Sequence, residues 1–426
     1  MRAELFSADQ MEQHGKALAG VHLLGRSGAR DRLLQRLDEN EQLLIGTCGV
    51  LTAAVKAKLR IAPAGEWLLD NFYLVEEQVR TARQHLPRGY SRELPRLAQG
   101  PSAGLPRVYD LALETISHGD GRVDPETLSR FVAAYQTVTP LTLGELWAIP
   151  IMLRLALIEN LRRVGARIAA ARIHLNQAQD WANLMMEIAE SDPKSLILVI
   201  ADMARSNPPM VSPFVAELAR RLQGHGPALA LPLTWIEQRL AESSMTIEQM
   251  VQLENQQQAA DHVSISNTIG SLRFLGATDW RGFVETMSAV EQALLRDPGH
   301  VYRDMDFTTR DRYRRVIDRL AKRSPLSEHE IAREAIALTE RGAAGDDGRG
   351  QAAHVGFYLI DQGLPQLERA VAARPALIQL LHKAVNRSPL ALHLGLIALL
   401  TALFSACLLG LAFEDGMRGW PLVPPG

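Results

Sequence analysis

Two aspartates separated by one residue, Asp304 and Asp306, have the spacing in this sequence that most directly suggests chemistry. Carboxylates that flank a single residue can share a divalent cation, and many glycosyltransferases hold a metal and a sugar nucleotide in this way. In those enzymes the motif ends a strand of an α/β sheet. Here it opens a helical pattern, where carboxylates are stabilised by the helix dipole. We therefore expect Asp304 and Asp306 to cap a helix, and we retain them only as weak metal candidates.

A basic cluster follows these aspartates and is mixed with tyrosine and aspartate. The simpler interpretation is a solvated helix face with ion pairs. The alternative is attraction to anionic lipid headgroups or to a phosphorylated sugar donor. The residues that would serve either purpose are Arg310, Arg312, Arg314 and Arg315.

Three other patterns that could carry chemistry have simpler explanations. Residues 100–104 match the G-x-S-x-G nucleophile elbow around Ser102, but that elbow needs a strand before it and a helix directly after it. Pro101 and Pro106 make both improbable, so we expect a turn. The twelve histidines form no HExxH and no His-x-x-x-His pair. Cys48 and Cys407 are too far apart in sequence for a clustered metal site, and we expect small buried hydrophobes. We predict no catalytic and no cofactor-binding residue.

The elements that would position these residues are centred on the segment 141–163. Thr142 and Glu145 have the spacing of a capping box, and Pro150 falls inside the helix that the box would start. The apolar run after Pro150 is too short to cross a bilayer. We therefore predict a deeply buried core helix.

The remainder of the chain is predicted to be helical, so the fold class is all-α. Residues 68–86 repeat apolar side chains at steps of three and four, and no convincing alternating strand is present. The length of 426 residues and the 47% hydrophobic content allow two or three domain-sized units. The predicted divisions are a flexible arm (1–30), two helical domains (31–165 and 166–341), a Gly-rich linker (342–350), a helical membrane-proximal segment (351–389), a transmembrane helix (390–413) and an extracytoplasmic tail (414–426).

The segment 390–413 differs in kind because it carries no formal charge over 24 residues. That length and composition predict a transmembrane helix. Lys383 and Arg387 lie on its amino side, so the positive-inside rule places the bulk of the chain in the cytoplasm. The amino terminus has no apolar core of a cleaved export signal. The net charge of −2 gives no general attraction to nucleic acid, and we expect none as a partner.

Several long motifs resemble the amino-terminal region of cyclic β-1,2-glucan synthases. From about residue 30 to the predicted membrane helix they occur in the same order as in that family. They are EWLLDNFY (66–73), LPRL (94–97), GLPRVY (104–109), LTLGELWAIPIMLRLALIENLRR (141–163), TDWR (278–281), MDFTTRDRYR (305–314) and HVGFY (354–358).

The resemblance implies a place in a large protein of the bacterial inner membrane. Members of that family carry a UDP-glucose-dependent glucosyltransferase module, followed by carbohydrate-processing modules that would be the partners of this chain. UDP-glucose and a divalent metal would be used there, and no cofactor is expected here. This sequence ends after the first predicted span, where the transferase module would begin. No catalytic residue is therefore carried over from the family. Whether this chain is itself an enzyme is left open by the resemblance.

Three hypotheses of different classes follow. The first is a non-catalytic cytoplasmic helical module with the first membrane span of such a synthase, either a fragment or a separately encoded part. The second is a sugar-active enzyme that uses Asp304 and Asp306 or the carboxylates of residues 66–77. The third is a free-standing membrane-anchored interaction protein without a carbohydrate role.

Overall fold

The computed structural model describes residues 4–25, 32–86, 90–345, 351–375, 397 and 400–406, and these residues are almost entirely helical. Within them, two strands of two residues each, β1 (Leu24–Gly25) and β2 (Arg96–Leu97), pair antiparallel. The predicted all-α class is confirmed. The chain divides into two compact units, residues 1–292 and 293–426.

Helix α7 (Leu143–Ser191) is the central element of the first unit. The predicted capping box starts it: Thr142 N donates to Glu145 Oε2 over 2.9 Å, and Glu145 N donates to Thr142 Oγ1 over 3.2 Å. The helix continues through Pro150 for 49 residues, which corresponds to about 74 Å at 1.5 Å per residue. The division predicted between residues 165 and 166 therefore lies inside one continuous helix.

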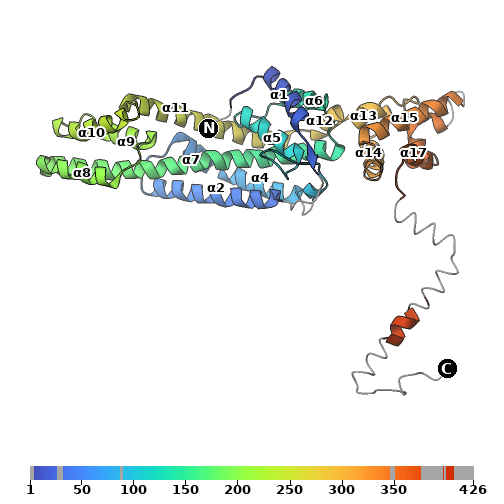
Figure 1. Ribbon diagram of the computed structural model, residues 1–426, viewed down its shortest axis with the longest axis horizontal. Helices are drawn as coiled ribbons and strands as arrows, with labels where there is room; N and C mark the ends of the chain where they lie inside the picture. Colours follow the sequence, from blue (N-terminus) through green and yellow to red (C-terminus); the bar gives the residue numbers. More distant parts are fainter. Residues whose placement is uncertain are drawn as a thin grey trace, which may run out of the picture. The chain divides into compact units, whose positions relative to one another are not determined.

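The amino-terminal half of α7 is buried on nearly all sides, as predicted. It packs against α2 (Leu33–Lys56), α5 (Arg107–His118) and α11 (Ile247–Ala277) (Figure 1). Leu153, Leu157 and Leu161 are fully buried there. Because three helices surround this half, its apolar residues need not fall on a single face.

The carboxyl-terminal half of α7 belongs to a second hydrophobic core, centred on residues such as Ala182, Met185, Phe214 and Leu218. The helices that complete this core are α8 (Leu196–Ser206), α9 (Ser212–Leu222) and α10 (Ala230–Ala241). The first unit also contains α3 (Pro63–Asp70), α4 (Phe72–His85), α6 (Pro125–Gln136) and α12 (Trp280–Met287). Its short 3-10 turns are η1 (Tyr90–Arg92), η2 (Pro193–Ser195) and η3 (Pro227–Leu229). Helix α13 (Ala289–Leu294) spans the boundary between the two units.

The prediction of a flexible arm over residues 1–30 is wrong for α1 (Ala8–Val21). Ser7 and Gln10 form a capping box at its start, and the helix packs along α6. Gly15 allows the two helices to approach closely, because a Cβ there would lie 2.9 Å from the carbonyl oxygen of Phe131. Helix α1 is polar overall, but the small residues on the face that contacts α6 allow the two helices to pack closely.

The second unit contains η4 (Tyr302–Asp304), α14 (Phe307–Ala321), α15 (Glu328–Gly345), η5 (Gln351–Ala353), α16 (Val355–Ile360) and α17 (Leu364–Ala370). The linker predicted for residues 342–350 begins too early, because α15 continues to Gly345. Gly342 lies against η5, where a Cβ would be 2.5 Å from the carbonyl oxygen of Ala352. Residues 346–350 lie outside the described residues.

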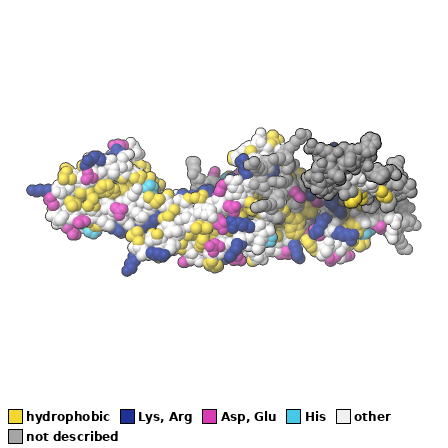
Figure 2. Space-filling model, turned by 90° about the horizontal axis from the view of Figure 1, so that it is seen from below, with side chains coloured by type: hydrophobic (Ala, Val, Ile, Leu, Met, Phe, Trp, Pro, Cys, Tyr) yellow, Lys and Arg dark blue, Asp and Glu magenta, His cyan; other side chains and the backbone are white. Residues whose placement is uncertain are grey.

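The transmembrane helix predicted for residues 390–413 lies mostly outside the described residues, and the tail 414–426 lies entirely outside them. Ile397 and residues 400–406 are described as helical with exposed side chains. Among the helices that the structure describes, none combines the length and the apolar character needed to cross a bilayer. On the face shown in Figure 2, acidic and basic side chains are interspersed.

Candidate functional site

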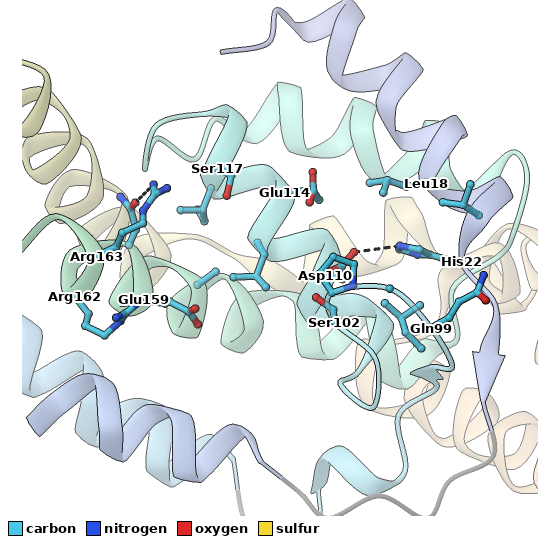
Figure 3. A pocket seen from close by; sticks show the side chains of 18 residues that line it. Leu18, His22, Gln99, Ser102, Asp110, Glu114, Ser117, Glu159, Arg162 and Arg163 are labelled. Atoms are coloured by element: carbon cyan, nitrogen blue, oxygen red, sulfur yellow. Dashed lines mark hydrogen bonds and ion pairs between the residues drawn. The ribbon is translucent and has the colours of Figure 1, made fainter. Parts of the chain in front are cut away.

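A pocket of about 650 Å³ opens in the first unit between α1, α5, α7 and the loop that leads into α5 (Figure 3). Its size falls within the usual range for small-molecule sites. Its polar lining consists mainly of His22, Ser102, Asp110, Glu114, Glu159 and Arg162. The side chains come from segments far apart in the sequence, so only the packing of these helices brings them together.

The loop that carries Ser102 is a turn, as predicted. Gly100 and Gly104 both have positive φ, at 88° and 81°, a conformation that glycine adopts without strain. Arg96 holds the turn by donating from Nη1 to the carbonyl oxygen of Gly104 over 2.8 Å. Ser102 is 6% exposed and hydrogen-bonds to Asp110. Residues 98–106 separate β2 from α5, so Ser102 does not lie on a sharp strand-to-helix turn and the loop is not a nucleophile elbow.

Asp110 lies between Ser102 and His22. His22 Nε2 is 3.1 Å from Asp110 Oδ2, and His22 Nδ1 is 3.0 Å from the hydroxyl of Tyr135. Burial alone would raise the pKa of Asp110, but hydrogen bonds from His22 and Ser102 outweigh it and the pKa is lowered. A nucleophilic triad needs the histidine between serine and carboxylate. Here the carboxylate of Asp110 lies between the serine and the histidine. The two neighbours therefore stabilise the ionised carboxylate, and the serine is not activated.

Glu159 on α7 is held in a similar way. Arg36 Nη2 donates to both of its carboxylate oxygens over 2.7 and 2.9 Å, and the Tyr109 hydroxyl donates to Oε2 over 2.6 Å. Burial would raise the pKa of Glu159, yet these hydrogen bonds lower it. A general acid needs a pKa near the working pH. Glu159 and Asp110 are therefore better suited to accept hydrogen bonds than to transfer protons.

Positive charge gathers at the other end of the pocket in Figure 3. Arg163 donates from Nη2 to Asn160 Oδ1 over 2.7 Å. The Nε of Arg162 is buried and has no hydrogen-bond partner among the described residues. A buried donor without a partner is costly. In Figure 3, Glu159 lies beside Arg162, whereas Asp110 lies toward the other end with His22. The pocket thus offers both hydrogen-bond acceptors and donors, which suits a polar, hydroxyl-rich ligand.

The predicted metal candidates lie in the second unit and behave mainly as helix-start residues. Asp306 is the N-cap of α14 and accepts from Thr308 N over 3.1 Å. Its pKa is lowered, chiefly by a hydrogen bond from Thr309. Asp304 ends η4, and both side chains are exposed. The cap interpretation is confirmed for Asp306.

The four arginines predicted to face an anionic ligand do not form one exposed surface. Arg314 is 1% exposed, and its guanidinium lies 4.9 Å from the ring centre of Phe307. Arg310 is half-buried, whereas Arg312 and Arg315 are exposed. Arg315 pairs with Asp311 over 2.6 Å. An anionic-ligand role stays a prediction for the exposed members only.

Two of the sequence motifs meet in the second unit. Tyr313 of MDFTTRDRYR and His354 of HVGFY face each other, with 3.3 Å between the hydroxyl and Nε2. His354 Nδ1 is 2.9 Å from Oδ2 of Asp297, whose Oδ1 accepts from Val355 N over 2.9 Å. A Cβ on Gly356 would lie 2.3 Å from the Tyr313 hydroxyl. This network explains why the segments need these residue types, and the sequence analysis missed it.

A third group, also missed, contains potential metal ligands. His14 of α1 and Glu114 and His118 of α5 bring one ligand atom each within 4.8 Å of one another. Glu114 and His118 are four residues apart, so they share one helix face, and that spacing was a usable signal. Cys48 is a buried free thiol, as predicted, with a pKa raised to about 11 by burial and by Glu76. Cys407 lies outside the described residues.

Comparison with known proteins agrees with the motifs. No family model matches the chain. A curated relative, the cyclic beta-(1,2)-glucan synthase NdvB of Rhizobium meliloti (strain 1021), is 31% identical over 390 residues. These residues are 91% of this chain but only 14% of the relative, so the chain spans about one seventh of that protein. The predicted resemblance is confirmed: over nine tenths of its length, this chain is similar to part of a cyclic β-1,2-glucan synthase.

Proposed function

We propose that this chain is a non-catalytic helical module that serves the synthesis of cyclic β-1,2-glucan. The observation that carries the proposal is the similarity to NdvB over 91% of the chain but only 14% of the relative. Glucosyl transfer from UDP-glucose would be performed by other modules of the synthase, and this module would support them. The similarity favours neither a protein without a carbohydrate role nor an independent sugar-active enzyme.

The chemistry of the described carboxylates supports a non-catalytic role. A sugar-nucleotide donor needs its diphosphate leaving group stabilised by a metal or a cationic clamp. Asp306 is engaged as a helix cap, and the pKa values of Asp110 and Glu159 are lowered by their own hydrogen-bond partners. These groups are already committed to holding the fold.

The long helix α7 gives the module a physical means of support. It connects two hydrophobic cores through one continuous helix. A displacement of one core would therefore be transmitted along the helix to the other core. The segment 390–413 would tie the module to the bacterial inner membrane, with most of the chain on the cytoplasmic side. The pocket lined by Asp110, Glu159 and Arg162 would bind a glucan or an intermediate without cleaving it.

The test has a biochemical and a genetic arm. Purified chain incubated with UDP-glucose and Mg²⁺ or Mn²⁺ is expected to make no glucan and to hydrolyse no sugar nucleotide. Metal-dependent turnover that disappears in the Asp304→Asn, Asp306→Asn double variant would overturn the proposal and establish an enzyme.

In the genetic arm, the matching region is deleted from the relative's synthase, and glucan is measured by mass spectrometry. Glucan should be lost and should return when this chain is supplied, whereas an unrelated helical protein of equal length should not restore it. Undiminished glucan from the truncated synthase would contradict a supporting role.

A further inference from the structure

We propose that His14, Glu114 and His118 bind one divalent transition-metal ion, with Zn²⁺ the best match, and that the ion fastens helix α1 to helix α5. Nothing in the proposed glucan role assigns such a site. The inference rests on the positions of these three side chains and on the contacts that orient them.

The three ligand atoms are already close. His14 Nε2 lies 2.7 Å from Glu114 Oε2, and His118 Nε2 lies 3.1 Å from the same oxygen. The two imidazole rings are 5.0 Å apart, centre to centre, in an edge-to-face arrangement. Two imidazoles and one carboxylate form a ligand set that Zn²⁺ uses when a fourth position is left to water.

The orientation of the His118 ring is the decisive point. Its Nδ1 lies 2.6 Å from the carbonyl oxygen of Glu4. Because a carbonyl oxygen only accepts, Nδ1 must carry a hydrogen. In the neutral ring, Nε2 then presents a lone pair to the Glu114 carboxylate, which is also an acceptor. A divalent ion between Nε2 and Glu114 Oε2, which lie 3.1 Å apart, would bind a lone pair of each atom.

The surroundings of His118 favour the metal ion. A ligating histidine usually donates its other ring nitrogen to a carbonyl or carboxylate, which fixes the tautomer, and Glu4 provides that contact here. The ring of Phe6 stacks on His118 with 3.8 Å between centres, and Phe6 N donates to the carbonyl oxygen of His118. The ring is thus held in orientation from two sides before any ion binds.

The site is also open enough for an ion to enter. The side chains of His14, Glu114 and His118 are 24%, 28% and 14% exposed. Glu114 borders the pocket of Figure 3, and His118 borders a second pocket of about 340 Å³. Solvent can therefore supply the fourth ligand. Because His14 is the only one of the three on α1, the metal would hold that helix against the body of the first unit.

The proposal is tested by metal binding to the full chain after treatment with a chelator. Calorimetric titration with Zn²⁺ should give one ion per chain, and Co²⁺ should give the visible absorption of a four-coordinate site. His14→Ala, His118→Ala and Glu114→Gln should each weaken binding by more than the about 10- to 100-fold typical of outer-shell changes. His225→Ala is the matched control, because that exposed histidine lies outside the cluster, and it should bind normally.

A second measurement separates loss of the site from loss of the fold. Zn²⁺ should slow hydrogen exchange of the α1 amides in the unaltered chain and leave it unchanged in Glu114→Gln, whose circular dichroism should remain helical. Zero stoichiometry in the unaltered chain would overturn the proposal. Full binding by the His14→Ala and His118→Ala variants would overturn it as well, because the ion would then lie elsewhere.

Discussion

The buried ion pair between Arg107 and Glu145 offers the sharpest test of how this fold is held together. Arg107 donates from Nε to Oε1 over 2.8 Å and from Nη2 to Oε2 over 2.6 Å. The side chains are 2% and 0% exposed. Arg107 lies in the GLPRVY motif and Glu145 in the motif of α7, and Glu145 also closes the capping box with Thr142. The pair therefore joins the starts of α5 and α7.

Removing one partner should be costly because the other charge is left buried. Arg107→Met leaves the Glu145 carboxylate with only its capping donors, and Glu145→Gln leaves the guanidinium without a counter-ion. Breaking such a buried pair costs about 3–5 kcal/mol. The double variant leaves neither charge in the core, so it should cost no more than either single variant.

The assay is a double-mutant cycle by urea unfolding of the full chain. In the first unit of 292 residues, a loss of this size corresponds to a fall in Tm of about 5–8 °C, at about 2.1 cal/mol/K of unfolding entropy per residue. The matched control is Arg239→Met, whose partner Glu242 is exposed, and its cost should stay below about 1 kcal/mol. If Arg107→Met costs no more than this control, or if the two single effects simply add, the pair is not energetically coupled and the reasoning fails.

Three further predictions concern other positions. The folded-state pKa of Glu159 lies below its ordinary value of 4.5, so its contribution to stability is present above that pH and is lost as pH falls through the folded-state pKa. Glu159→Gln should therefore flatten the acid limb of Tm against pH, and an unchanged limb would contradict the shift. Gly121 has φ +78°, and a Cβ there would lie 2.2 Å from Thr268 Oγ1, so Gly121→Ala should cost about 2 kcal/mol or more in urea unfolding; an unaltered midpoint would exclude this close approach. Asp297 is 1% exposed and accepts from the amide of Val355, so Asp297→Ala should cost about 1–3 kcal/mol and speed hydrogen exchange at Val355, whereas unchanged exchange would show that the bond is not made.

The starts of the major helices could be predicted from the sequence because their signals are local. Thr142 with Glu145 forms the expected capping box of α7, and Thr246 with Gln249 has the same spacing and forms the capping box of α11. Asp124, which directly precedes a proline, caps α6 by accepting from Thr127 N. In each case a side chain satisfies an amide that lies two or three residues away. Such contacts need no tertiary structure, so spacing alone identifies them.

Helix α1 shows where local signals were insufficient. Its sequence is polar, and the apolar part of its contact face is made of Met11 and Ala19, with Gly15 between them. Such a face gives little hydrophobic periodicity. Its stability comes from close packing on α6, which a window of sequence does not contain. The signal that was present, Ser7 followed by Gln10, is a capping box.

The sequence by itself determined the all-α class, the buried central helix, the cap at Asp306 and the resemblance to a glucan synthase. Only the tertiary structure decided that Arg314 is buried, that Tyr313 meets His354, and that His14 reaches a glutamate 100 residues away. The physical reason is that helical periodicity specifies which side chains share a face of one helix. Which face of another helix lies opposite depends on how complementary surfaces pack across the whole core.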